Sequence, residues 1–62
     1  MCEAAAYIGK NGQEELFLAD VDIIEPEKDG LRLVNIFGEQ RVVNATIHSL
    51  NLVNHRVILL EK

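Results

Sequence analysis

Closely spaced turn signals are the feature that most restricts the fold of this 62-residue chain. Asn11-Gly12 and Asp29-Gly30 are dipeptides typical of tight β-hairpins, because their residues adopt the positive φ angles that such turns require. Gly38-Glu39 marks a third turn, and Asn54-His55 marks a weaker fourth turn that lacks glycine. The segments between the turns have the length of strands, and no longer window shows the apolar spacing of a helix.

The alternation of apolar and polar residues predicts short strands throughout the chain. They cover residues 3–9, 13–18, 21–27, 31–37, 40–47, 50–53 and 56–61. In the stretch 31–37 the alternation is clearest, with Leu31, Leu33, Asn35 and Phe37 on one face. Pro26 cannot donate to a strand ladder, so the end of its strand is expected at an edge or a bulge. We therefore predict an all-β fold, a small antiparallel barrel of six or seven short strands, SH3-like or Sm-like, with one domain over residues 1–62.

The small size of the chain suggests that a second copy helps to stabilise it. A domain of this length buries only about 60% of the surface that its unfolded chain exposes. No internal disulfide can form, because Cys2 is the only cysteine, and no Cys/His quartet indicates a structural zinc. The run Val57-Ile58-Leu59-Leu60 is apolar throughout, which indicates a strand covered on both faces. A homodimer explains this run, and the alternative is a central strand covered by loops of its own chain.

The charge and hydropathy of the chain argue against nucleic acid and membrane partners. The net charge is −4, with ten acidic residues against six basic ones that are scattered singly. Binding to nucleic acid requires a basic stripe along the phosphates, and the chain has none. No apolar run approaches the roughly 18 residues of a membrane span, and no signal peptide is visible. A lone cysteine fits a reducing compartment, so we expect a cytoplasmic protein.

Side chains for enzymatic catalysis are scarce. The chain has one serine, Ser49, and one threonine, Thr46. A triad of Ser49, His48 and Asp20 can be drawn, but nothing in the spacing favours it. Gly9 and Gly12 flank a turn and not a strand-to-helix junction, so no phosphate-binding loop is present. We expect that the protein is not an enzyme.

Two groups of residues are of metal-binding types without a familiar motif. The first is an acidic cluster on one predicted strand and its flank, which is interpreted as a solvated strand face or, alternatively, as a hard-cation site. Its members are Asp20, Asp22, Glu25 and Glu27. The second group is His48 and His55, seven positions apart, each either an ordinary polar residue or an additional ligand.

Cys2 is the strongest candidate metal ligand. Removal of Met1 would leave a terminal cysteine, whose α-amine and thiolate can close a five-membered chelate ring. Two such ends, related by a two-fold axis, would present two sulfurs and two nitrogens, a set that suits Ni(II) or Cu(II). The alternatives are a small buried residue, an intermolecular disulfide and a terminal residue without a role.

The sequence resembles the CooT-type nickel-binding proteins, which accompany carbon monoxide dehydrogenase. The resemblance is carried by the start Met1-Cys2-Glu3-Ala4, the segment Leu18-Ala19-Asp20-Val21, the strand 31–37 before a Gly-Glu turn, and the hydrophobic last hairpin. It implies a homodimeric metallochaperone or nickel sensor that holds Ni(II) through Cys2 of each subunit, one ion per dimer. It also implies the dehydrogenase or its maturation proteins as partners. The alternative is an Sm-like or SH3-like protein- or RNA-binding module without a metal role.

Overall fold

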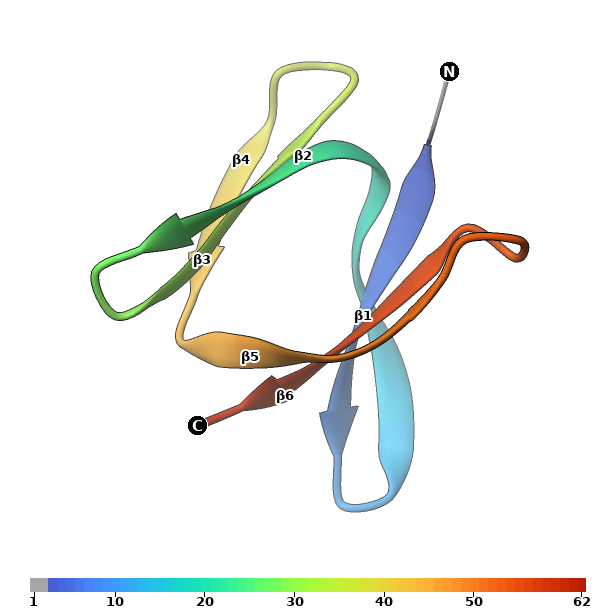
Figure 1. Ribbon diagram of the computed structural model, residues 1–62, viewed down its shortest axis with the longest axis vertical. Helices are drawn as coiled ribbons and strands as arrows, with labels where there is room; N and C mark the ends of the chain where they lie inside the picture. The colour runs from blue at the N-terminus through green and yellow to red at the C-terminus, as the bar shows by residue number, and fades with distance from the viewer. Residues whose placement is uncertain (1–2) are drawn as a thin grey trace.

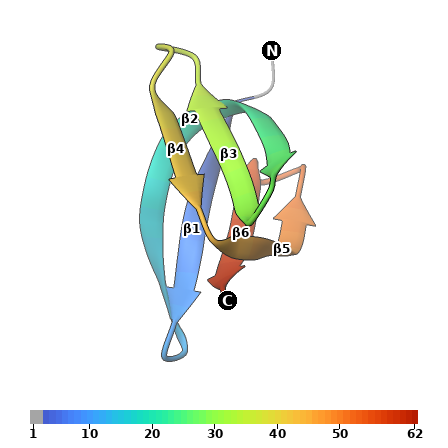
Figure 2. The same cartoon turned by 90° about the vertical axis from the view of Figure 1, so that its left-hand side faces the viewer.

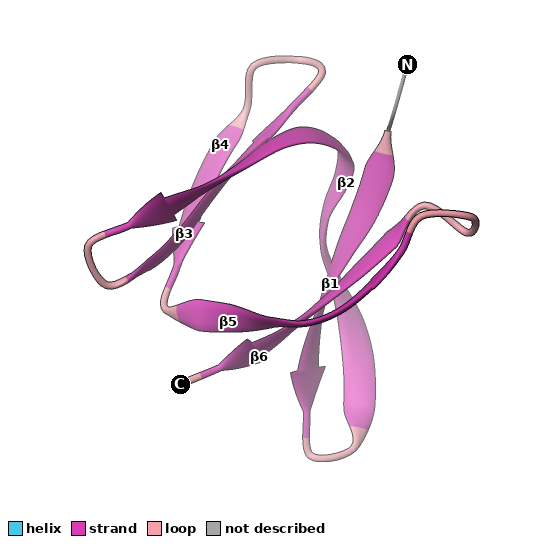
Figure 3. Cartoon of the chain, viewed as in Figure 1, coloured by secondary structure: helices cyan, strands magenta, loops and turns pink. Residues whose placement is uncertain are grey.

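The computed structural model describes residues 3–62, and these residues form six strands that belong to one sheet. The strands are β1 (Ala4–Lys10), β2 (Gln13–Glu27), β3 (Gly30–Asn35), β4 (Gln40–Val43), β5 (Ala45–Asn51) and β6 (Arg56–Glu61). Their order in the sheet is β4-β3-β2-β1-β6-β5, and the sheet curls into a half-barrel (Figure 1). The prediction of an all-β fold is confirmed, and residues 3–62 contain no helix (Figure 3). Accordingly, this part of the chain contains no helix that could cross a membrane.

Strand pairing is antiparallel except where the two ends of the chain meet. β1 pairs with β2, β2 with β3, β3 with β4, and β5 with β6, all in antiparallel register. β1 and β6 are parallel, with Ala6 opposite Val57 and Ile8 opposite Leu59. This pair joins the first strand to the last hairpin and places β6 inside the sheet, between β1 and β5.

The predicted strands 13–18 and 21–27 are one bent strand, β2. Asp20 has a φ of 58°, and the register of β2 shifts on both sides of it. The first half of β2 pairs with β1 and the second half pairs with β3, so the bend curls the sheet. Pro26 lies opposite Leu31 of β3, beyond the end of the ladder with β1, which confirms the edge position expected for it.

The chain after β4 differs from the predicted strands 40–47 and 50–53. Asn44 separates β4 from β5, and its carbonyl accepts a hydrogen bond from the Lys62 amide at 3.0 Å. β5 then runs along β6 as far as Asn51 (Figure 2). Leu52 and Val53 consequently lie in the turn to β6 and not in a strand.

The core is small and lies on the inner face of the half-barrel. Leu33 of β3 and Leu59 of β6 are its largest fully buried side chains. Gly30 begins β3 where a Cβ atom would clash with the Val43 carbonyl oxygen, so no other residue fits there without a backbone shift. The buried core residues are Ala6, Ile8, Leu18, Val21, Leu33, Ala45, Val57 and Leu59.

The strand predicted for residues 31–37 ends two residues early because of Asn35. This side chain is buried, and its Oδ1 accepts hydrogen bonds from the amides of Phe37 (3.0 Å) and Glu39 (2.9 Å). Its Nδ2 donates to Glu39 Oε1 at 2.5 Å. These bonds fold the chain into the β3–β4 turn, so placing Phe37 in the strand was wrong, and its side chain lies on the surface.

The apolar run 57–60 is covered within one chain for most of its length. Its first three residues are buried, and β6 is an internal strand of the sheet. On the outer face, Ile58 lies opposite Tyr7 of β1, and the Arg56 guanidinium stacks over the Tyr7 ring at 4.5 Å. This arrangement agrees with the alternative of a central strand, although side chains of β1 and β6, and not loops, lie over it. Contact with a second copy would therefore involve residues outside the buried part of this run.

Candidate functional site

The predicted metal ligand Cys2 lies outside the described residues, but the structure places the residues that follow it. β1 enters the sheet at Ala4, opposite Val21 of β2. The Ala5 amide donates a hydrogen bond to the His55 carbonyl at 2.8 Å, and Ala5 is the parallel partner of Arg56. The start of β1 therefore lies between the bend of β2 and the β5–β6 turn.

Exposed aliphatic side chains surround this turn. Leu52 and Val53 are 76% and 87% exposed, although Leu and Val are among the residues most often buried. Asn51 Oδ1 accepts the Asn54 amide at 3.0 Å, and His55 has a φ of 56°, so the turn has a defined conformation that holds both side chains outward. Leu50 and Ile47 continue the exposed strip along β5. We call these four residues, Ile47, Leu50, Leu52 and Val53, the β5 surface.

The structure places the two histidines in different surroundings. His55 is exposed and adjoins the start of β1 through its backbone carbonyl. His48 lies at the bulge of β5, where it borders a shallow groove against the β1–β2 hairpin. Over residues 3–62, no three His, Asp or Glu side chains gather closely enough to hold a metal ion.

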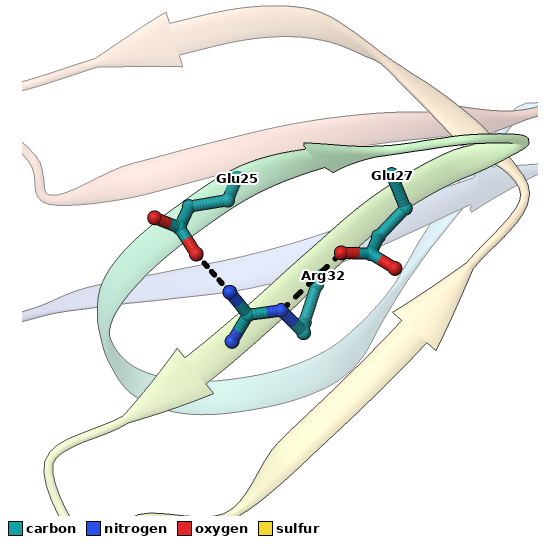
Figure 4. A network of polar contacts seen from close by, with 3 residues as sticks. All are labelled: Glu25, Glu27 and Arg32. Carbon is teal, nitrogen blue, oxygen red and sulfur yellow. Dashed lines mark hydrogen bonds and ion pairs between the residues drawn. The ribbon is translucent and has the colours of Figure 1, made fainter.

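Two of the four residues of the acidic cluster are paired with an arginine. Arg32 of β3 forms ion pairs with Glu25 and Glu27 of β2, the latter at 3.4 Å between Nε and Oε2 (Figure 4). Glu25 lies directly opposite Arg32 in the ladder, so the strand register itself brings the pair together. This arrangement agrees with a solvated strand face and not with a hard-cation site. The sequence prediction of this cluster did not include Arg32. Arg32 lies between Leu31 and Leu33, so the strand alternation already places it on the outer face.

Asp20, the acid of the hypothetical triad, lies on β2, whereas Ser49 and His48 are neighbours on β5. Ser49 is opposite Ile58 in the β5–β6 ladder, and Thr46 is opposite Leu60. Asp20 lies at the bend of β2, where its carbonyl accepts the Ile36 amide at 2.9 Å. The structure thus gives Ser49 no acid–base relay through Asp20.

Comparisons with known proteins identify the family. The family model described as CO dehydrogenase accessory protein CooT matches residues 1–60. A search of curated proteins returns no match. Among solved structures, the crystal structure of a protein assigned as CooT from Carboxydothermus hydrogenoformans superposes with a TM-score of 0.94, at 48% identity over 98% of each chain. The alignment therefore includes the bent β2, the parallel β1–β6 pair and the β5–β6 turn. On these grounds the chain belongs to the CooT family of CO dehydrogenase accessory proteins.

Proposed function

We propose that this protein carries or senses nickel for the maturation of nickel-dependent carbon monoxide dehydrogenase in the cytoplasm, without an enzymatic activity of its own. Ni(II) is the cargo, and Cys2 of each subunit of a homodimer holds it. The observation that carries the proposal is the family match, which extends over Cys2 and describes an accessory protein of this enzyme.

The chemistry of the chain terminus suits this cargo. After removal of Met1, Cys2 supplies a soft thiolate and an α-amine nitrogen on adjacent carbons. Both groups must lose a proton when the metal binds, and their ordinary pKa values of about 8 and 8.5 allow this near neutral pH. Two chelating ends give a four-donor N,S set, which favours Ni(II) or Cu(II) over Mg(II) or Ca(II).

The β5 surface supports the two-copy arrangement. It adjoins the start of β1 through the bond between Ala5 and His55, so a partner that covers Leu52 and Val53 also approaches the end of the chain. Burying exposed aliphatic side chains stabilises association by about 25 cal/mol per Å². If two copies meet at this surface across a two-fold axis that passes close to the start of β1, the two β1 strands begin near each other.

The metal-free alternative has less support. No comparison points to an RNA- or protein-binding module without a metal role, and the net charge of −4 opposes binding to phosphates.

Nickel titration of the purified protein tests the proposal, with Cys2→Ser as the decisive variant. The wild type should develop near-ultraviolet absorption from thiolate-to-nickel charge transfer, saturating at one nickel per two chains. Cys2→Ser should lose this absorption and bind nickel at least 100-fold more weakly.

Two histidine variants serve as controls in the same titration. His48→Gln removes the imidazole at the β5 bulge, and His55→Asn removes the imidazole of the β5–β6 turn while retaining a residue that tolerates positive φ. Both should keep the absorption. Unchanged nickel binding by Cys2→Ser would contradict the assignment of Cys2, whereas loss of the absorption in His48→Gln would contradict a site made by the two chain ends alone.

A further inference from the structure

The β1–β2 hairpin ends in a two-residue turn, Asn11-Gly12, that extends away from the rest of the sheet (Figures 1 and 2). Lys10 is opposite Gln13 in the ladder, so only these two residues connect the strands. Asn11 has a φ of 50° and Gly12 a φ of 77°, the positive values of a tight hairpin turn. Both residues are exposed, and a Cβ atom at Gly12 would have no neighbour within 4 Å. Water therefore has access to the peptide bond between them.

The two groups that can react with each other at this turn are not held by hydrogen bonds. Within residues 3–62, the Asn11 side-chain amide forms no hydrogen bond, and the Gly12 amide donates to no backbone carbonyl. Attack of the Gly12 nitrogen on the Asn11 Cγ closes a five-membered ring. Glycine has no Cβ atom to obstruct this approach. The turn thus combines an accessible electrophile with an accessible nucleophile.

The other asparagines lack this combination. Both polar atoms of the Asn35 side chain are hydrogen-bonded, and the Ile36 amide, which would have to attack it, donates to the Asp20 carbonyl at 2.9 Å. Asn51 Oδ1 accepts the Asn54 amide at 3.0 Å. In addition, each of the four is followed by a residue with a Cβ atom. The four pairs are Asn35-Ile36, Asn44-Ala45, Asn51-Leu52 and Asn54-His55.

We propose that Asn11 is a site of spontaneous deamidation, with water as the co-reactant. The deprotonated Gly12 nitrogen forms a C–N bond to the Asn11 Cγ, and the side-chain nitrogen leaves as ammonia. Water then adds to one of the two carbonyl carbons of the cyclic imide and breaks its bond to the Gly12 nitrogen. Opening at the side-chain carbonyl gives aspartate, and opening at the main-chain carbonyl gives isoaspartate. The net reaction consumes one water, releases one ammonia and transfers no electrons.

The modification changes the hairpin in charge and in main-chain length. Either product has a carboxyl group with an ordinary pKa of about 3.9, which is ionised at neutral pH. This one further negative charge takes the net charge from −4 to −5. Isoaspartate also adds a methylene group to the main chain, so the turn no longer matches the pairing of Lys10 with Gln13. The inference goes beyond the proposed nickel function, because it involves neither Cys2 nor the β5 surface.

Incubation of the metal-free full chain in mildly alkaline buffer, followed by peptide mapping with mass spectrometry, tests this proposal. The peptide that contains Asn11 should gain the mass difference between –NH₂ and –OH and separate into an aspartyl and an isoaspartyl species. Conversion should accelerate with rising pH, because the attacking nitrogen must lose its proton. In the folded protein it should be at least tenfold faster at Asn11 than at any other asparagine.

Two variants separate the chemistry from its effect on the hairpin. Gly12→Ala adds a Cβ atom beside the attacking nitrogen and should slow conversion at least tenfold. Asn11→Asp carries the added charge on an unaltered main chain. Hydrogen exchange of the Lys10 and Gln13 amides should therefore be at least tenfold faster in the isoaspartyl species than in freshly prepared Asn11→Asp.

Three outcomes would overturn the proposal. The first is an unchanged Asn11 under conditions in which a synthetic peptide of residues 7–15 converts. The second is faster conversion at another asparagine of the folded chain. The third is an isoaspartyl species with the same hydrogen exchange as Asn11→Asp, which would refute the effect on the hairpin. Because no metal is present, all of these outcomes are independent of the nickel titration.

Discussion

β5 and β6 are neighbours in one hairpin and both are rich in aliphatic residues, yet the protein buries one and exposes the other. Leu59 is 0% and Val57 is 3% exposed on β6, whereas their cross-strand partners Ile47 and Leu50 on β5 are 44% and 55% exposed. Directly opposite residues project from the same face of a sheet. The difference therefore does not come from which face the side chains occupy, but from what lies over that face.

Position in the curled sheet accounts for the contrast. β6 is flanked by β1 and β5, and the inner face beneath it is filled by side chains from β1, β2 and β3. β5 is paired on one side only, and all of its residues after Ala45 are exposed. Burial in this small domain thus depends on sheet closure as much as on hydropathy. The apolar residues left outside the closure are the ones available to a second copy.

The largest effect should come from truncating the covered member of a cross-strand pair. Leu59→Ala leaves a cavity in a filled core and should lower the free energy of unfolding by about 2–5 kcal/mol. Ile47→Ala, its half-exposed partner, should cost about 1 kcal/mol or less. Urea denaturation of both variants at one protein concentration measures the difference. Equal losses of stability would show that the contrast between the strands is not energetic.

The next largest effect concerns two asparagines whose side chains accept hydrogen bonds in turns. Asn35 is buried, and Asn51 is exposed. Asn35→Ala leaves the Phe37 and Glu39 amides without their acceptor in a buried site, and should cost about 1–3 kcal/mol. Asn51→Ala removes a single exposed bond to Asn54 and should cost about 0.5–1 kcal/mol. Thermal unfolding ranks the two variants, and the reverse order would undermine the role given to burial.

A third experiment tests whether the exposed side chains have a partner. The double variant Leu52→Ser, Val53→Ser should weaken a homodimer at least tenfold, equivalent to about 1.4 kcal/mol, because it removes apolar area from the contact. Sedimentation equilibrium measures this change. Phe37→Ser, which alters an equally exposed residue far along the sheet, is the matched control and should leave the association unchanged. If the wild-type protein remains monomeric at high micromolar concentration, the proposed homodimer is wrong.

The smallest effect is expected from the ion pairs on the outer face. Arg32→Gln breaks both contacts to Glu25 and Glu27, but these carboxylates are about half exposed, so stability should change by less than about 1 kcal/mol. The change should shrink further at high salt. Chemical denaturation with and without added sodium chloride measures both effects. A loss above about 2 kcal/mol would mean that these ion pairs stabilise the protein as strongly as contacts in the core do.

Much of the fold could be predicted from local sequence because its hairpins are encoded locally. The dipeptides Asn11-Gly12 and Asp29-Gly30 mark the β1–β2 and β2–β3 turns correctly. The joining of two predicted strands at Asp20 could not be foreseen, because the two halves of β2 pair with different strands, β1 and β3, on either side of that residue. The parallel β1–β6 pair likewise depends on contacts between the two ends of the chain.

The candidate site was also predictable only in part, because some of its features are local in the sequence and others depend on distant strands. The family follows from a sequence pattern that includes Cys2, and the comparisons confirm it. In contrast, the hydropathy of the run 57–60 fits either a dimer contact or a central strand, and the structure shows that the sheet covers most of it within one chain. Leu52 and Val53 had been placed in a strand, so their exposure in the turn was missed. Hydropathy indicates which residues favour burial, whereas only the closed sheet shows which remain uncovered.

Native mass spectrometry of the protein with and without nickel tests the central claim most directly, because it counts chains and metal ions in one measurement. We predict a dimer of chains that begin at Cys2, carrying a single nickel ion, and the loss of both nickel and dimer in the Leu52→Ser, Val53→Ser variant. Nickel bound to monomers, at one ion per chain and with no change in that variant, would contradict the claim that two chain ends share the metal beside the β5 surface.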